Sequence, residues 1–247
     1  MRLSTRLHML HRVWRYRLRS ERNELAFVLG RDLDCATVLD VGANWGIYAY
    51  WLHKKVGPRG TVVAFEPQLE LGRHLHDFKA AFGLKNLIIA NVGLSSRNGS
   101  ATLVRARGHW GGASLELPPR EDTDCLTVEL TTLDAYFAQR PELRPIRLIK
   151  CDVEGHEFDV FRGGEQVLRQ DRPELLFECA DRVVREGKLF GFLESLGYQG
   201  FYFFRRRLTP VTTYAALRHA IDRPYLNYVF VPTASAKAMA WRPIRAA

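Results

Sequence analysis

Residues 38–46 read Val-Leu-Asp-Val-Gly-Ala-Asn-Trp-Gly, and this segment is the starting point for the fold. Residues 38–41 are mostly apolar and predict a short buried strand, whereas residues 47–56 predict a helix. Gly42 allows a tight turn between them because it carries no Cβ, and Gly46 allows another group to approach the start of the helix. Such a strand–turn–helix unit is how α/β proteins hold a nucleotide-like ligand at the carboxyl ends of their strands.

The spacing within this segment narrows the class of ligand. A dinucleotide-binding turn, G-x-G-x-x-G, would need further glycines where Asn44 and Ile47 stand. Asp40, two residues before the first glycine, suits a ligand with an ammonium group. A second apolar run at residues 61–65 ends in Glu66, which is placed to accept hydrogen bonds from ribose hydroxyls. Together these features predict a pocket for S-adenosylmethionine (SAM).

Composition restricts the class of protein. The chain has 247 residues, 47% of them hydrophobic, which is enough for one globular domain with a sizeable core. No run approaches the roughly 20 apolar residues of a membrane span. The formal charge of +9 points to an anionic partner, which could be a nucleic acid, an acidic glycan or a membrane face.

The four cysteines are scattered without a C-x-x-C pair or a cluster with zinc spacing, which is typical of a reducing compartment. No secretory leader pattern is present. We therefore expect a cytoplasmic protein, either free or peripheral to a membrane.

The first 29 residues predict a basic amphipathic helix. Its apolar residues recur at steps of three and four and share one face: Leu3, Leu7, Leu10, Trp14 and Leu18. Arginines surround this face, and no acid occurs before Glu21. Three interpretations are open: the apolar stripe packs on the domain or on another subunit of a homo-oligomer, the helix lies on an anionic membrane surface, or it is a mitochondrial transit peptide.

The remaining chain alternates strands and helices, which predicts a mainly parallel sheet with helices on both faces. We expect the domain to span residues 30–231 and the tail, residues 232–247, to be basic and mobile. The expected elements include a third strand at 87–94 with a hairpin partner at 101–104, a lid-like loop at 105–124, a helix at 181–196 and two antiparallel final strands at 200–204 and 227–231.

Polar residues end five apolar runs of the predicted sheet: Asp40, Glu66, Asn91, Asp152 and Glu178. Because the carboxyl ends of parallel strands share one edge, we expect these residues to meet there. Asp152 and Glu178 end neighbouring strands, so they could tune one another's pKa for acid–base chemistry or share a divalent cation such as Mg²⁺. His156 could take a proton from an acceptor, although a helix N-cap role for Asp152 and a solvent-facing His156 stay open.

These motifs resemble the FkbM-type family of SAM-dependent methyltransferases. The matching segments are VLDVGANWG (38–46), FEP (65–67), NVGLS (91–95), TTLDAYF (131–137), IKCDVEGHE (149–157) and PELLFE (173–178). The resemblance covers somewhat over half of the chain and implies an α/β, Rossmann-like class I methyltransferase fold with an antiparallel last strand. The family commonly has alanine where Gly93 stands here.

The resemblance also implies an activity, O-methylation of a hydroxyl on a sugar, glycan or secondary metabolite. By position it assigns Asp40, Gly42, Asn44 and Gly46 to the methionine side of SAM, Glu66 to the ribose, Asn91 and Val92 to the adenine, and Asp152 to the methyl group. The acceptor oxygen would attack the methyl group in line, with Asp152 or His156 as base and Glu178 orienting the acceptor or helping to hold a cation. Trp110 could stack on a sugar face or pack the loop.

Two other functions compete with this one. RNA methylation is favoured by the positive charge, but the chain lacks an Asn/Asp-Pro-Pro-Tyr/Phe segment and a Pro-Cys nucleophile, so nucleic acid is a disfavoured partner. A non-catalytic adaptor could keep the fold, but such a relative would be expected to have lost some of Asp40, Glu66 and Asp152, and all three are present.

Overall fold

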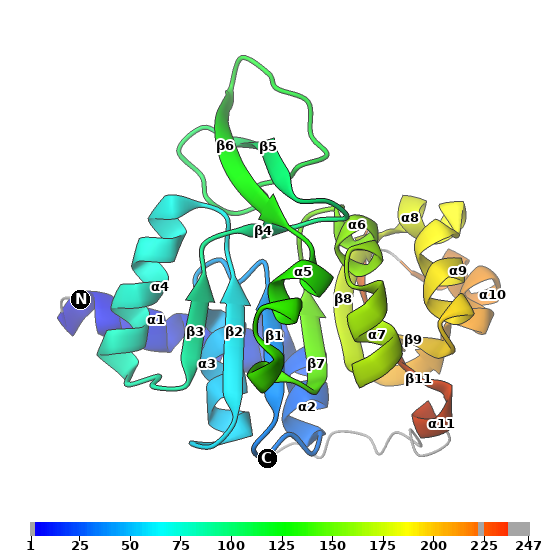
Figure 1. Cartoon of the computed structure of the whole chain (residues 1–247). Helices are drawn as coiled ribbons and strands as arrows, with labels where there is room; N and C mark the ends of the chain where they lie inside the picture. Colours follow the sequence, from blue (N-terminus) through cyan, green and yellow to red (C-terminus); the bar gives the residue numbers. More distant parts are fainter. Residues whose placement is uncertain (1–2, 222–224, 237–247) are drawn as a thin grey trace.

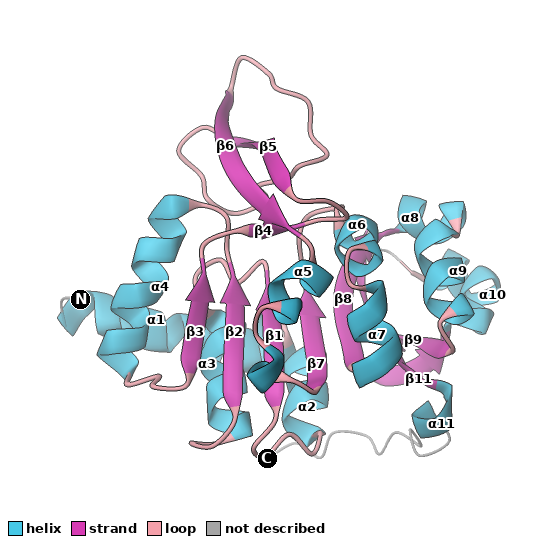
Figure 2. Ribbon diagram, in the orientation of Figure 1, coloured by secondary structure: helices cyan, strands magenta, loops and turns pink. Residues whose placement is uncertain are grey.

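The computed structural model describes residues 3–221 and 225–236. Eight strands form the main sheet in the order β10-β9-β11-β8-β7-β1-β2-β3 (Figures 1 and 2). The parallel strands are β1 (Thr37–Val41), β2 (Thr61–Phe65), β3 (Leu87–Ala90), β7 (Ile146–Cys151) and β8 (Glu174–Ala180). The antiparallel ones are β9 (Tyr198–Phe204), β10 (Arg207–Pro210) and β11 (Tyr225–Pro232). The predicted mainly parallel fold with antiparallel final strands is confirmed.

Helices cover both faces of this sheet because its central strands are apolar on both sides. In β1, Val38 packs into one hydrophobic cluster, while Leu39 and Val41 pack into the other. The first cluster lies against α1 (Leu3–Arg15), α2 (Arg22–Gly30), α3 (Ile47–Val56) and α4 (Leu69–Phe82). The second lies against α5 (Leu133–Ala138), α6 (Glu157–Arg162), α7 (Glu165–Asp171) and α9 (Lys188–Ser195). The remaining helices are α8 (Asp181–Glu186), α10 (Tyr214–Leu217) and α11 (Thr233–Ala236).

A second, three-stranded sheet stands above the carboxyl edge of the main sheet (Figure 1). It contains β4 (Gly93–Leu94), β5 (Gly99–Ala106) and β6 (Thr123–Thr131). The predicted hairpin between residues 87–94 and 101–104 is therefore wrong, since β5 pairs antiparallel with β6 instead. The apolar side of β5 explains the choice: Leu103 packs against Val128 and Leu130 of β6. The connecting loop is also shorter than predicted, covering residues 107–122.

The N-terminal segment differs from the prediction in two ways. The helix is interrupted by a π-helical turn, Tyr16–Ser20, between α1 and α2. The buried side of α1 carries Met9 and Val13, and Trp51 Nε1 donates a hydrogen bond to the Val13 carbonyl at 3.2 Å. The predicted apolar stripe faces outward instead: Leu7, Trp14 and Leu18 are 59%, 47% and 60% exposed. Helix α1 has two apolar faces, and the spacing of its apolar residues does not indicate which face packs against the core.

The C-terminal third also departs from the predicted boundaries. Gly187, with φ of 71°, ends α8 and separates it from α9 within the predicted helix 181–196. Of the predicted mobile tail at 232–247, residues 233–236 form α11, and residues 237–247 lie outside the described residues. In the part of the chain that the structure describes, no helix combines the length and the apolar character needed to cross a membrane.

Candidate active site

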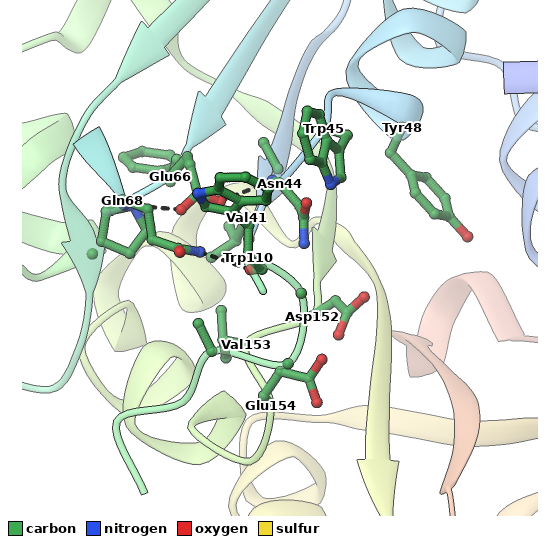
Figure 3. A pocket seen from close by; sticks show the side chains of 18 of the residues that line it. Val41, Asn44, Trp45, Tyr48, Glu66, Gln68, Trp110, Asp152, Val153 and Glu154 are labelled. Carbon is green, nitrogen blue, oxygen red and sulfur yellow. Dashed lines mark hydrogen bonds between the residues drawn. The ribbon is translucent and has the colours of Figure 1, made fainter. Parts of the chain in front are cut away.

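A cavity of about 230 Å³ lies at the carboxyl ends of β1, β2 and β7, beneath loop 107–122 (Figure 3). Its wall comes from segments far apart in the sequence: residues 41–45, 47–48, 65–68, 92–94, 110–113 and 152–154, with Leu103, Leu115, Lys150 and His156 and, from the N-terminal segment, Arg12, Tyr16 and Glu21. Carboxyl ends of parallel strands are where open α/β sheets bind ligands.

The turn after β1 requires glycine at its first position. Gly42 has φ of 75°, and a Cβ on it would lie 1.9 Å from the carbonyl oxygen of Asp152. The amides of Gly42 and Ala43 both donate to the Phe65 carbonyl at 3.0 Å. The turn therefore packs between Phe65 at the end of β2 and Asp152 after β7, and its backbone lines the cavity.

Glu66 is held in place by the backbone around it. Its Oε2 accepts a hydrogen bond from the Asn44 amide and its Oε1 one from the Gln68 amide, both at 2.9 Å. Burial raises the pKa of Glu66 to about 7, although the Gln68 and Asn44 hydrogen bonds lower it. Each carboxylate oxygen keeps lone pairs for further donors, so Glu66 can receive a pair of hydroxyl groups from the cavity. We call Gly42, Asn44 and Glu66 the turn side of the cavity.

A buried lysine crosses the floor of the site. Lys150 Nζ lies 3.3 Å from Asp152 Oδ2, 3.8 Å from Asp40 Oδ1 and 4.8 Å from the centre of the Tyr48 ring. Burial disfavours the charged form, but Asp152 and Asp40 more than offset this, and the pKa of Lys150 is raised. Burial also raises the pKa of Asp40 to about 6, against the effect of Lys150. One cation therefore serves two carboxyl groups.

Further acids gather around Asp152, and we call Glu21, Asp152 and Glu154 the acid side of the cavity. In Figure 3, Asp152 and Glu154 lie together, apart from Glu66. Burial raises the pKa of Glu21 to about 7, even though the Tyr48 hydroxyl donates to its Oε2 at 3.0 Å. The pKa of Glu154 is raised by burial and by Asp152. Glu21 can therefore exchange a proton near neutral pH.

The loop after Asp152 is shaped by an acid that does not line the cavity. Glu157 Oε1 accepts hydrogen bonds from the amides of Val153 and Gly155 at 3.1 and 3.2 Å. Glu154 has φ of 55°, a left-handed conformation that costs a non-glycine residue energy. Glu157 thus stabilises the strained backbone that directs Glu154 toward the cavity.

Loop 107–122 is attached to the rim at several points. Gln68 Nε2 donates to the Trp110 carbonyl at 3.0 Å, and Ser114 Oγ donates to the Glu154 carbonyl at 2.7 Å. His156 lies between Glu116 Oε1, 2.6 Å from its Nδ1, and Ser95 Oγ, 2.9 Å from its Nε2. Both ring nitrogens of His156 are therefore engaged, and the imidazole links the loop to the end of β4.

Six of the predicted site residues line this one cavity, and four do not. Gly42, Asn44, Glu66, Val92, Asp152 and His156 are in its wall. Asp40 is fully buried beneath the floor, beside Lys150. Asn91 braces the end of β2 from outside, donating from Nδ2 to the Glu66 carbonyl at 2.5 Å.

Gly46 and Glu178 also lie outside the wall. Gly46 has φ of 80°, and a Cβ there would lie 2.8 Å from Leu75 Cδ2, so its glycine serves the packing of α4 on α3. Glu178 stands at the end of β8, next to the end of β7 in the sheet. Burial raises its pKa to about 7, and Asp152 and Glu21 add to this.

Asp152 and Glu178, the residues expected to share Mg²⁺, do not belong to a group of three possible metal ligands among the described residues. Asp152 already faces the ammonium group of Lys150, which would repel a divalent cation. Among the described residues, the three potential ligands that lie within 4.8 Å of one another are instead Glu116, His156 and Asp159. Their donor atoms are occupied by one another and by Ser95 and Ser96.

Sequence reasoning missed Lys150, Glu21, Arg12 and Tyr16. Lys150 carried a usable signal, because it interrupts the apolar run of β7 and a buried cation needs an acidic partner. The other three come from the N-terminal segment, where nothing in the residue pattern indicates which way α1 faces.

Comparisons with known proteins agree with this architecture. Residues 40–201 match the family model described as the methyltransferase FkbM domain. Methyltransferase 1 of Beauveria bassiana (strain ARSEF 2860) is 24% identical over 147 residues, which cover 53% of this chain and 59% of that protein.

Solved structures share the fold at low identity. The FkbM methyltransferase of Methylobacillus flagellatus aligns with a TM-score of 0.52 and 14% identity over 80% of this chain and 44% of that one. A protein of Clostridium thermocellum assigned as an rRNA methylase aligns with a TM-score of 0.52 and 9% identity over 86% of this chain and 94% of that one. The chain thus spans less than two thirds of the Beauveria and Methylobacillus proteins. The family match extends over more than half of its residues, and the chain belongs to the FkbM family of methyltransferases.

Proposed function

We propose that the protein is a SAM-dependent O-methyltransferase that acts on a hydroxyl group of a sugar, glycan or secondary metabolite. The observation that carries this proposal is the cavity itself, which brings the Gly42 turn, Glu66 and Asp152 together at one edge of the sheet. The family match supports methyl transfer, and the cavity supports the identity of the donor.

The turn side fits the nucleoside part of SAM. Glu66, fixed by two amides, would accept hydrogen bonds from the ribose hydroxyls, and Val92 would flank the adenine. The backbone of Gly42 and Asn44 would line the methionine part. When bound, SAM supplies an electrophilic methyl group on a positively charged sulfur, and the carboxylates of the acid side favour that charge.

The acid side fits the acceptor. Glu21 lines the cavity, and its pKa is raised to about 7, so it can remove a hydroxyl proton at neutral pH. Asp152, paired with Lys150, would orient the acceptor and stabilise positive charge beside it. We assign the base to Glu21 rather than to His156, because both ring nitrogens of His156 are engaged. Clustered acids also disfavour a polyanionic acceptor such as RNA.

Loop 107–122 would have to move for the donor to bind. The cavity of about 230 Å³ is below the roughly 300–1,000 Å³ of pockets that enclose drug-sized ligands. Residues 110–113 and Leu115 are the part of the wall that loop 107–122 supplies. We therefore expect an opening and closing step in each turnover.

The test begins with donor binding. Titration calorimetry with SAM and S-adenosylhomocysteine should show binding to the full chain, and Glu66→Gln should weaken it by about tenfold or more, because charge-assisted hydrogen bonds to the ribose are lost. Glu142→Gln, an exposed carboxylate that does not line the cavity, is the matched control. Absence of SAM binding, or equal effects of the two variants, would overturn the assignment of the cavity.

Acceptor chemistry needs a second experiment. The enzyme is incubated with methyl-labelled SAM and a panel of sugars, glycans and phenolic metabolites, each paired with a derivative whose hydroxyls are blocked. We expect label transfer only to the free hydroxyl compounds. Transfer to RNA or to an amine instead would reject O-methylation while leaving SAM dependence intact.

A further inference from the structure

Helix α1 and the π-helical turn after it present an apolar face that is largely exposed, although the Trp14 ring packs edge-on against Trp51, with 5.1 Å between the ring centres. Of the large hydrophobic residues exposed in the described chain, Leu7, Trp14 and Leu18 all belong to the first 18 residues. Their exposed fractions are 59%, 47% and 60%. We call these three residues the N-terminal stripe.

The stripe is separate from the side of α1 that packs on the core. At about 100° per residue, Leu7 and Trp14 lie within roughly 20° of each other around the helix. Met9 and Val13, which are buried, lie about 160° and 120° from Leu7. The stripe therefore lies on a different side of the helix from Met9 and Val13, and only one edge of Trp14 reaches the core, at Trp51.

Positive charge flanks the stripe on both sides. Arg6 and Arg15 are exposed and lie about 100° and 80° from Leu7 in opposite directions around the helix. Arg17 stacks over the rings of Trp14 and Trp51, at 5.5 and 4.4 Å from their centres. No acid precedes Glu21 in the sequence, so this charge is not offset within the segment.

We propose that the N-terminal stripe docks on an anionic lipid membrane, with α1 lying parallel to the surface. An apolar strip bearing Leu and Trp, bordered by arginines, is the composition of helices that sit at the boundary of headgroups and acyl chains. The arginine side chains can reach anionic headgroups while their stems cover apolar surface. The attraction to anionic lipid adds to the burial of the leucines.

Two other occupants fit this face less well. A symmetric dimer through the stripe would place two arginine-rich helices against each other with no acid between them, and like charges across an interface are costly. An RNA would satisfy the arginines but would leave Leu7 and Leu18 without an apolar partner. Of these three occupants, only an anionic membrane offers both negative charge to the arginines and an apolar phase to Leu7 and Leu18.

Docking would bring the active site close to the lipid. The same helix turns Arg12 toward the cavity, and Tyr16 follows it in the π-helical turn. The cavity wall would then stand about one helix diameter, roughly 10–12 Å, from the membrane surface. This proposal concerns binding alone and does not depend on the identity of the methyl acceptor.

Vesicle flotation with the purified full chain tests the proposal. Vesicles of phosphatidylcholine alone are compared with vesicles containing an equal part of phosphatidylglycerol, at low and at high salt. We expect binding to the anionic vesicles, at least about tenfold weaker binding to the neutral ones, and loss of binding as salt screens the charges.

Two double variants separate the stripe from general surface properties. Leu7→Glu with Leu18→Glu should reduce binding to anionic vesicles by at least about tenfold. Leu69→Glu with Leu117→Glu is the matched control, since these leucines are 51% and 49% exposed elsewhere and the change in charge is the same. Arg6→Glu with Arg15→Glu is a third variant that keeps the leucines and should also reduce binding.

Circular dichroism and thermal unfolding check that each variant is folded. Failure of the wild-type chain to float with anionic vesicles would overturn the proposal, as would equal losses in the stripe and control variants. A dimer in light scattering that the Leu7/Leu18 variant converts to a monomer would assign the face to a second copy. RNA binding without vesicle binding would assign it to a nucleic acid.

Discussion

The turn side and the acid side of the cavity are built by different means. Gly42, Asn44 and Glu66 lie within 25 consecutive residues, and main-chain amides fix Glu66. The acid side joins Glu21 of the N-terminal segment to Asp152 and Glu154 after β7. It consists of like charges gathered around one lysine.

This contrast separates a rigid region from an adjustable one. Backbone hydrogen bonds and a glycine turn leave the turn side little freedom to change without unfolding locally. On the acid side, Glu21 accepts a side-chain hydrogen bond from Tyr48 instead of main-chain amides, so this carboxyl can move and change its charge at little cost. A rigid turn side suits a methyl donor that is the same in every reaction, and an adjustable acid side suits an acceptor that can vary.

The most damaging change should be on the turn side, Gly42→Ala. Its Cβ would overlap the Asp152 carbonyl oxygen at 1.9 Å, so we expect a loss of more than about 3 kcal/mol in the free energy of unfolding and no measurable SAM binding. Gly83→Ala is the matched control, because Gly83 has φ of 64° but no heavy atom within 4 Å of a Cβ. It should cost only about 1–2 kcal/mol. Similar unfolding curves for the two variants would show that the turn is not rigid.

On the acid side, Asp152→Asn should leave the fold intact but reduce kcat/KM by about 100-fold or more, because charge next to the reacting atoms is lost. SAM affinity should change by less than about tenfold, since the turn side is untouched. Asp32→Asn, an exposed residue outside the cavity, should behave as wild type in steady-state kinetics. An Asp152→Asn enzyme with normal kcat/KM would remove this residue from the mechanism.

The loop that covers both sides offers a smaller effect. Glu116→Gln weakens the hydrogen bond to His156, and we expect SAM to dissociate about three- to fivefold faster in stopped-flow measurements, which corresponds to the loss of one partly exposed hydrogen bond. Glu121→Gln in the same loop is exposed and is the control. Unchanged dissociation in both variants would mean that loop 107–122 does not limit donor release.

The smallest effect concerns pH. Burial and Asp152 raise the pKa of Glu178 from 4.5 to about 7. Between these values the folded protein retains a proton that the unfolded chain releases, so this group's contribution to stability falls as pH rises from 4.5 through 7. In Glu178→Gln, the decrease in Tm between pH 6 and pH 8 should be smaller than in wild type by about 2–4 °C. Calorimetric scans give this decrease for wild type, for Glu178→Gln and for the control Glu142→Gln. The same decrease in all three proteins would contradict a raised pKa of Glu178.

Local patterns were sufficient for much of the fold. The apolar runs of β1, β2 and β7 and the turn at Gly42 were predicted because their causes lie in adjacent residues. The pairing of β5 with β6 was missed, because Leu103 meets Val128 and Leu130 only across a loop. Gly46 was placed in the pocket for the same reason: the contact that needs a glycine there, Leu75, lies in the next helix.

By itself the sequence determined the strand–turn–helix unit, the α/β class and the edge of the sheet where ligands bind, since strand ends and glycine turns follow from neighbouring residues. Only the tertiary structure decided that Lys150 pairs with both Asp40 and Asp152 and that Glu21 and Tyr16 reach the cavity. It also decided which apolar face of α1 is buried. Most of these outcomes depend on packing and on electrostatic interactions between residues distant in the sequence, such as Val13 with Trp51 and Asp40 with Lys150, which no local pattern contains.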